Sequence, residues 1–173
     1  MIKIIDDFFE DILFTNIKNY IVSEINFKPK YLEGTTEKTQ ENFYGNRFKL
    51  SGNLELRSIF IKQSEKKFNI KINTLDDESG IDIRNLDHFV PHIDTGFSKM
   101  NILIMMKGPT AVTNGTVFYT DNNLDMHIGF RENRAIMFPS DKLHSPHASN
   151  TPNLKRYTVS LFIQEYSTKM NKM

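Results

Sequence analysis

The sequence predicts an α+β protein in which N-terminal helices pack against a twisted antiparallel β-sandwich or jelly roll. Apolar residues recur every three or four positions before about residue 68, and they alternate with polar residues from residue 69 onward. Turn residues then separate several short β-rich stretches. Helices followed by strands are typical of this class. With 173 residues, we expect one domain, 1–173, with a helical part at about 1–68 and a β core at about 69–165.

The first expected element is an amphipathic helix near the N-terminus. Asp7 and Glu10 have the spacing of a capping box, which marks a helix start. The apolar positions that follow have the helical period and would form one buried face: Phe8, Phe9, Ile12, Leu13, Ile17, Tyr20, Ile21 and Ile25.

A second helix is expected from about Asn53 to Phe68, with Leu56 and Phe60 on its apolar face. Lys66 and Lys67 near its end suit the negative end of the helix dipole. Between the two helices, residues 27–52 are polar and rich in glycine, and we expect a loop or a short irregular strand there.

The remainder of the chain reads as strands. Ile70 and Ile72, then Ile81 and Ile83, alternate with polar residues, which indicates half-buried strands. Five further β-rich stretches follow in order: MNILIMM, GTVFYT, MHIGF, RAIMF and RYTVSLFI. Gly115, at the start of GTVFYT, is expected to permit a close approach of neighbouring backbone.

Composition excludes several classes of site. The 22 Lys and Arg residues nearly balance the 21 Asp and Glu residues, so there is no clear nucleic-acid signal. Cysteine is absent, which removes disulfides, thiolate zinc sites and cysteine nucleophiles, so any metal must be held by nitrogen and oxygen. The start MIKIIDDFFED does not resemble a signal peptide and no apolar run has membrane-spanning length, so we expect a cytoplasmic protein. No G-x-S-x-G nucleophile elbow is present.

Two histidines and one aspartate suggest a metal site. His92 and Asp94 in PHIDTG are two positions apart, so in an extended segment their side chains point to the same side. His144 follows fifty positions after Asp94, just beyond the apolar run AIMF, where another strand would end. Two imidazoles and a carboxylate form the facial set that binds non-haem Fe(II) and leaves coordination positions open. A His-x-Asp pair alone is weak evidence, because it often occurs by chance.

Arg156 stands inside the otherwise apolar last strand. If its guanidinium points inward it needs an anionic or polar partner, and a bidentate contact with the carboxylate of a ligand would provide one. An ion pair at a strand edge is the simpler explanation. Thr158 lies two positions further on the same face, where it would bond the same carboxylate or serve only as a β-favourable residue.

Taken together, these motifs resemble a known family. HID, NGTVFY, NRAIMFPSDKLHS and KRYTVSLF resemble, over roughly residues 81–163, the double-stranded β-helix core (a jelly roll, cupin-like) of the Fe(II)/2-oxoglutarate-dependent oxygenases, closest to the prolyl-hydroxylase-like branch. The resemblance implies that His92, Asp94 and His144 bind iron. It also implies that Arg156, helped by Thr158, binds the far carboxylate of 2-oxoglutarate.

The activity that this resemblance implies is a hydroxylation that consumes O2 and releases succinate and CO2. Asp94 favours hydroxylation over halogenation, because related halogenases have a small residue in place of this carboxylate. The implied substrate is a small molecule or a peptide, such as a peptidyl proline or an amino-acid-like compound. The sequence does not indicate an oligomeric state.

Some assignments stay open at this point. His147 lies nine residues before Arg156, a spacing that also occurs in the prolyl-hydroxylase branch, whereas His144 lies twelve before it. We prefer His144 because of its distance from the preceding phenylalanine and serine in FPSDKLHS. We expect His88 and His127 to be ordinary histidines without a role in the site.

The sequence also departs from the family pattern. Where a tyrosine often helps to hold 2-oxoglutarate, the strand NILIMM offers Met105, and Asn101 or Tyr119 are the candidates to replace that tyrosine. Two other functions therefore stay open. One is a cupin-like metal-dependent enzyme that does not use 2-oxoglutarate, and the other is a non-catalytic β-sandwich binding module.

Overall fold

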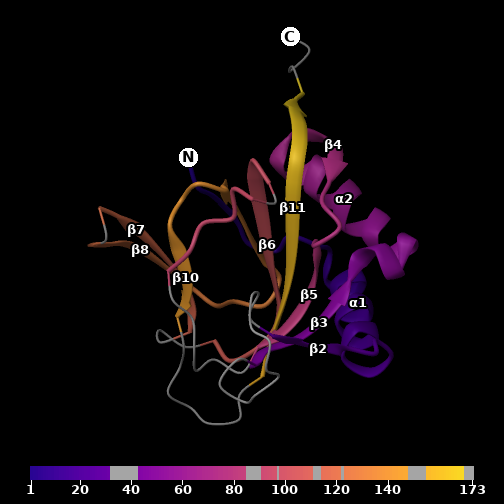
Figure 1. Ribbon diagram of the computed structural model, residues 1–173. Coiled ribbons are helices and arrows are strands. Elements are labelled where there is room, and N and C mark those ends of the chain that lie inside the picture. Colours follow the sequence, from indigo (N-terminus) through magenta and orange to yellow (C-terminus); the bar gives the residue numbers. More distant parts are fainter. Residues whose placement is uncertain are drawn as a thin grey trace.

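The computed structural model describes residues 1–31, 43–84, 91–96, 98–110, 114–121, 123–147 and 155–169. Within these residues the chain forms two antiparallel β-sheets, and two α-helices cover the outer face of the larger one (Figure 1). The helices are α1 (Asp11–Ser23) and α2 (Leu54–Phe68), preceded by a short 3-10 turn, η2 (Leu50–Gly52). None of the described helices combines the length and the apolar character needed to cross a membrane.

The larger sheet has eight strands, and its central strand is the longest. Along the sheet the order is β1-β9-β6-β11-β5-β3-β2, and β4 pairs with the second half of β11. The strands are β1 (Lys3–Ile5), β2 (Lys28–Tyr31), β3 (Phe43–Lys49), β4 (Ile70–Leu75), β5 (Gly80–Arg84), β6 (Met100–Lys107), β9 (Arg134–Pro139) and β11 (Arg156–Thr168). The smaller sheet has the order β10-β7-β8, with β7 (Gly115–Thr120), β8 (Asn123–Gly129) and β10 (His144–His147).

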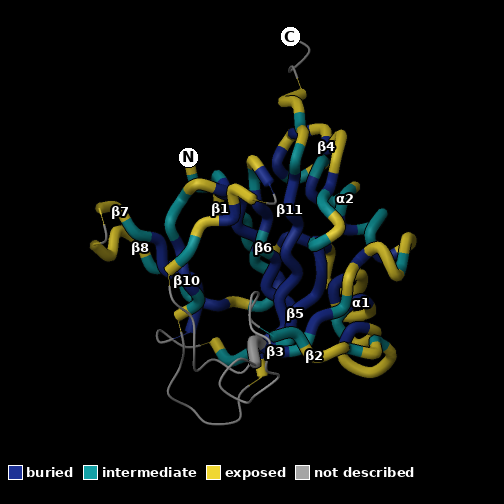
Figure 2. The backbone as a smooth tube through the Cα atoms, viewed as in Figure 1, coloured by how far each residue is buried: buried dark blue, intermediate teal, exposed yellow. Residues whose placement is uncertain are grey.

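The side chains of strand β11 point alternately to the two faces of the large sheet, and an apolar layer lies on each face. Its odd-numbered residues, such as Val159 and Leu161, pack with Phe14 of α1 and Phe60 of α2 in a core under the helices. Burying side chains of this size stabilises the fold by about 1.5–3 kcal/mol each. The second layer lies between the two sheets and contains Met105, Phe118, Ile128, Phe130, Ile136 and Phe138. The even-numbered residues from Arg156 to Phe162 therefore face the space between the sheets, where Figure 2 shows β11 deeply buried.

The N-terminal helix starts later than the sequence predicts. It begins at Asp11, and its N-cap, Glu10, makes no capping bond through its side chain, so the expected capping box is wrong. The reason is a long-range contact: the backbone N–H of Phe9 donates to Oδ1 of Asn133 at 2.9 Å, and the Asn133 amide donates back to the carbonyl of Phe9 at 2.9 Å. These bonds hold Phe8 and Phe9 outside the helix, although both side chains are buried in the core.

The second helix is confirmed, at Leu54–Phe68, and the side chain of Asn53 caps it by accepting from Leu56 N at 3.0 Å. The polar stretch before it contributes more structure than we expect from the sequence. Its described residues form β2 and β3, which extend the large sheet beside β5. Their apolar alternation is weak because the inward positions carry charged groups such as Arg47, which pairs with Asp82.

Candidate metal centre

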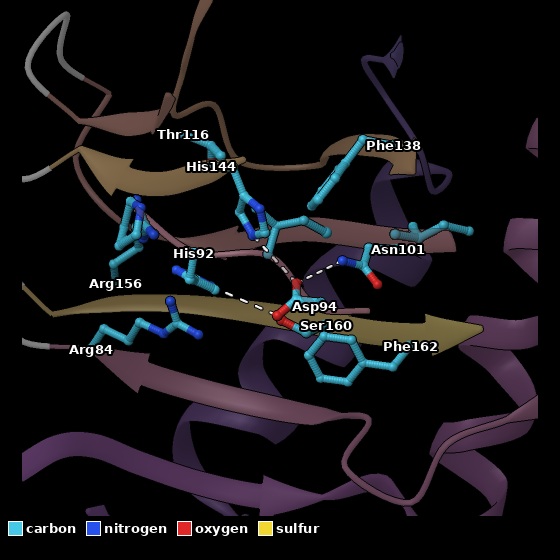
Figure 3. A pocket seen from close by; sticks show the side chains of 13 residues that line it. Arg84, His92, Asp94, Asn101, Thr116, Phe138, His144, Arg156, Ser160 and Phe162 are labelled. Carbon is cyan, nitrogen blue, oxygen red and sulfur yellow. Dashed lines mark hydrogen bonds and ion pairs between the residues drawn. The ribbon is translucent and has the colours of Figure 1, made fainter. Parts of the chain in front are cut away.

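His92, Asp94 and His144 meet at one point between the sheets (Figure 3). One potential ligand atom from each residue lies within 4.8 Å of the others. His92 Nε2 is 3.8 Å from Asp94 Oδ1, and His144 Nε2 is 3.4 Å from Asp94 Oδ2. Two nitrogens and a carboxylate at this spacing suit a divalent cation such as ferrous iron.

Backbone pairing brings the two histidines together. His92 precedes β6, and His144 is the first residue of β10. The N–H of His92 donates to the carbonyl of His144 at 2.9 Å, and the N–H of His144 donates back at 3.0 Å, an isolated antiparallel bridge. Asp94 N also donates to Ser140 O at 2.8 Å. The geometry of the cluster is therefore set by main-chain bonds as well as by its side chains.

Other groups orient the imidazole and the carboxylate. Nδ1 of His144 lies 3.0 Å from the carbonyl of Lys142, which favours a proton on Nδ1. Nε2 is then unprotonated, and its lone pair is available to bind a metal beside Asp94. Asn101 donates its amide N–H to Asp94 Oδ2 at 2.6 Å, and Ser98 bonds the other side of the same amide. The three candidate ligands therefore have the polar support that metal-binding residues require.

Burial changes the protonation of His144. Desolvation, followed by the charge of His92, lowers the pKa of His144 to about 4, although Asp94 acts in the opposite direction. At neutral pH its ring is therefore uncharged, which is the form in which Nε2 can coordinate a metal.

Arg156 lies in the same cavity as the cluster. It is only 2% exposed, and its Nη1 donates to the carbonyl of Gly115 at 2.6 Å and to Asn114 Oδ1 at 3.4 Å. The buried hydroxyls of Thr116 and Thr158 have no hydrogen-bond partner among the described residues. Thr116 lines the cavity, and Thr158 shares the inward side of β11 with Arg156. A carboxylate ligand would fit this group, because it accepts from guanidinium and hydroxyl donors.

The structure separates the other candidate residues from this cluster. His147 is exposed, and its ring lies 5.0 Å from that of His127 rather than beside His92. His88 lies outside the described residues. The Tyr119 hydroxyl is 2.9 Å from Ser145 Oγ, and Met105 is fully buried between the sheets.

Sequence reasoning missed several side chains around the cavity. Asn101, which the sequence offers only as a replacement for the family's tyrosine, supports Asp94. Arg84 and Thr116 also line the cavity, although the sequence assigns neither of them a role. The alternation of Asp82 and Arg84 with Ile81 and Ile83 is typical of a strand with one solvent face, so this pattern does not reveal that the polar face is buried as well.

Comparisons with known proteins show the fold. No family model matches the sequence, and no curated protein matches it. Among solved structures, the non-haem alpha ketoglutarate dependent epimerase SnoN from nogalamycin biosynthesis aligns with a TM-score of 0.65 at 6% identity, over 99% of this chain and 82% of that one. A second SnoN structure, with Fe3+, alpha ketoglutarate and nogalamycin RO, has a TM-score of 0.63 at 7% identity, over 99% and 82%.

Two prolyl hydroxylases match nearly as well. The enzyme from Trichoplax adhaerens, in complex with a hypoxia inducible factor peptide, has a TM-score of 0.61 at 12% identity, over 94% of this chain and 83% of that one. The prolyl-4-hydroxylase of Pseudomonas putida has a TM-score of 0.61 at 12% identity, over 95% and 92%. The chain therefore shares the fold of the SnoN epimerase and of these prolyl hydroxylases.

Proposed function

We propose that this protein is an Fe(II)- and 2-oxoglutarate-dependent dioxygenase that hydroxylates a small molecule or a peptide and releases succinate and CO2. The observation that carries the proposal is one cavity lined both by the His92, Asp94 and His144 cluster and by the buried Arg156. We also propose that the two sheets form a double-stranded β-helix and that residues 1–173 are one domain, for which the likeness to SnoN and the prolyl hydroxylases is support.

In this proposal the cluster holds the metal. His92, Asp94 and His144 would hold a ferrous ion, since two imidazole nitrogens and one carboxylate are the donor set that suits it. Iron bound there would supply the activation of O2, which no side chain can provide. The protein keeps His144 uncharged and holds its ring through the carbonyl of Lys142, while Asn101 fixes the carboxylate of Asp94.

Arg156 would anchor the far carboxylate of the co-substrate. A guanidinium matches a carboxylate with two parallel hydrogen bonds, and the bond to the Gly115 carbonyl holds Arg156 in place beforehand. The hydroxyls of Thr158 and Thr116 would add donors to the same carboxylate. These hydroxyls would replace the polar contact that a tyrosine often makes with 2-oxoglutarate in the family and that this sequence lacks.

Aromatic side chains would limit water around the metal. Phe138 and Phe162 line the cavity, and the Phe138 ring centroid is 4.8 Å from that of His144. Low water content strengthens the polar contacts of bound ligands. The neighbours support both substrate classes, since one prolyl hydroxylase was solved with a peptide and SnoN with nogalamycin RO.

An anaerobic titration tests the proposal. Adding Fe(II) and then 2-oxoglutarate to the purified protein should produce a visible charge-transfer band, and admission of O2 should then yield succinate. The Arg156→Met variant is the control, because it should bind iron but fail to form the band at the same 2-oxoglutarate concentration. Iron binding without a band or succinate would favour a cupin-like enzyme of another kind. A protein that binds no iron would favour a binding module.

A further inference from the structure

A short series of buried polar groups leads from the carboxylate of Asp94 into the protein. Asn101 donates to Asp94 Oδ2 at 2.6 Å (Figure 3), and the hydroxyl of Ser98 donates to Oδ1 of the same asparagine. Ser140 Oγ then donates to the backbone carbonyl of Ser98 at 2.6 Å. All four residues are buried, so water competes little for these hydrogen bonds.

The two ends of the Asn101 amide have nearly equal size but opposite hydrogen-bonding roles. Nδ2 donates, whereas Oδ1 only accepts. Rotating the amide by half a turn would bring Oδ1 against the carboxylate of Asp94, so that two oxygens with negative charge would face each other. This repulsion is stronger in a buried site than in water, because the local dielectric constant is low. The support that Asn101 gives to Asp94 therefore depends on which end of the amide faces the carboxylate.

Ser98 is placed to fix the orientation of that amide. Its one hydroxyl proton goes to Asn101 Oδ1, since the carbonyl oxygen of Asp94 is further away, at 3.5 Å. With Oδ1 engaged by Ser98, the amide N–H points to Asp94. Ser98 is itself held by the main chain, because its N–H donates to the carbonyl of Asp94 at 3.2 Å and its own carbonyl accepts from Ser140.

We infer that Ser98 is a positioning residue for the metal, which acts by holding the Asn101 amide with its N–H toward Asp94. The inference rests on the proposed function, since it takes His92, Asp94 and His144 as the metal ligands. Ser98 would thus raise the affinity for the metal without contributing a ligand atom.

A double-mutant cycle with Mn(II) tests the inference. The four proteins are the wild type, Ser98→Ala, Asn101→Leu and the double variant, and the EPR signal of free Mn(II) measures their affinities. Ser98→Ala should weaken Mn(II) binding by about threefold or more in the wild-type background, because the amide loses the bond that fixes it. In the Asn101→Leu background no amide remains to be fixed, so the same change should alter the affinity by less than about twofold.

Two further measurements separate positioning from a general loss of stability. Ser64→Ala removes another buried serine hydroxyl, on α2 at the opposite face of the large sheet, and should leave Mn(II) affinity unchanged. At saturating Mn(II), Ser98→Ala should also keep its affinity for 2-oxoglutarate, because Arg156 binds the far carboxylate in the proposed function. If Ser98→Ala does not fold, Ser98→Cys replaces it in the cycle with the same expected pattern, since a thiol is similar in size and only a weak donor.

Two results would overturn the inference. Wild-type Mn(II) affinity in Ser98→Ala or in Asn101→Leu would show that the amide needs no such orientation. Equal weakening by Ser98→Ala in both backgrounds would show that Ser98 acts independently of Asn101. Failure of the proposed function would look different, because the wild-type protein itself would then bind no Mn(II), or would bind Mn(II) but not 2-oxoglutarate.

Discussion

Asn101 donates a hydrogen bond of 2.6 Å from its side-chain amide to Oδ2 of Asp94. Asn101 is 3% exposed and lies on β6, seven residues after the aspartate. The bond holds the carboxylate so that Oδ1 lies toward His92, at 3.8 Å from its Nε2. A strand of the large sheet thus fixes a side chain that belongs to the segment before it.

Asn101→Leu should therefore weaken metal binding. Leucine has nearly the same size but cannot donate to Asp94, and loss of such supporting bonds lowers metal affinity by about 10–100-fold. A titration with Mn(II) measures this effect. As a control, Asn123→Leu changes an exposed asparagine on β8 and should leave the affinity unchanged. Equal affinity in the Asn101 variant and the wild type would show that Asp94 needs no such support.

His144→Ala should lose bound iron, whereas His147→Ala should retain it. His144 contributes to the cluster, while the exposed His147 lies beside His127. Iron content after anaerobic reconstitution and desalting gives the answer. The reverse result, with iron kept in His144→Ala and lost in His147→Ala, would make His147 the distal ligand.

Arg156→Lys should weaken 2-oxoglutarate binding by about tenfold while metal affinity is kept. Lysine retains the positive charge but loses the planar pair of donors and the fit to the Gly115 carbonyl. The charge-transfer band, titrated with 2-oxoglutarate, measures this affinity. Lys155→Met, a change of the exposed neighbouring cation, is the matched control. An unchanged affinity in Arg156→Lys would remove Arg156 from the co-substrate site.

Acid should destabilise the fold through Asp82. Its pKa in the folded protein lies below the ordinary value of 3.8, because Arg47 and Arg84 outweigh the opposing effect of burial. At a pH between this lowered pKa and the ordinary value, the unfolded chain binds more protons than the folded one, so stability rises with pH. The contribution is fully present above the ordinary pKa and is lost as the pH falls through the lowered one.

Urea unfolding of the wild type and of Asp82→Asn, from neutral pH to about pH 3, measures this dependence. The variant should be less stable at neutral pH, since it removes the closer of the two carboxylates that pair with Arg47, and its stability should fall less steeply in acid. Two parallel curves would mean that Asp82 does not carry the effect.

Gly115→Ala should lower both stability and 2-oxoglutarate affinity. A Cβ at this position would lie 2.2 Å from the carbonyl oxygen of Ile128, so the backbone must shift. We expect a loss of about 1–3 kcal/mol from such overpacking, and the Gly115 carbonyl would move away from Arg156. Gly129→Ala is the control, because Gly129 is the register partner on β8 and has no atom within 4 Å of an added Cβ. Equal melting temperatures would contradict the argument.

Much of the fold is readable from local patterns. The second helix follows from the period of Leu56 and Phe60 and from the cap at Asn53. The strands of the β core follow from their alternation, and the residue types His92, Asp94 and His144 suggest a metal before any geometry is known. In each case the determining interactions lie within a few residues, or the chemistry of the side chains restricts the choice.

Contacts between distant segments are what the sequence conceals. Asn133 holds Phe8 and Phe9 outside the first helix, and no local pattern shows it. Strands β2 and β3 look like loop because their inward groups are charged, and the charge of Arg47 is balanced by Asp82, thirty-five positions away. Arg84 escapes notice for the same reason, and so does the support that Asn101 gives to Asp94, since both depend on which strands become neighbours.

The backbone bridge between His92 and His144 also protects the smaller sheet. Strand β10 ends that sheet, and an end strand offers unused N–H and C=O groups with which foreign chains can align and aggregate. At His144 those groups are engaged by His92. Both imidazoles belong to the candidate metal site, so a bound ion would stabilise this backbone pairing. Removing the ion should therefore leave the end strand β10 more accessible and make the protein more prone to self-association.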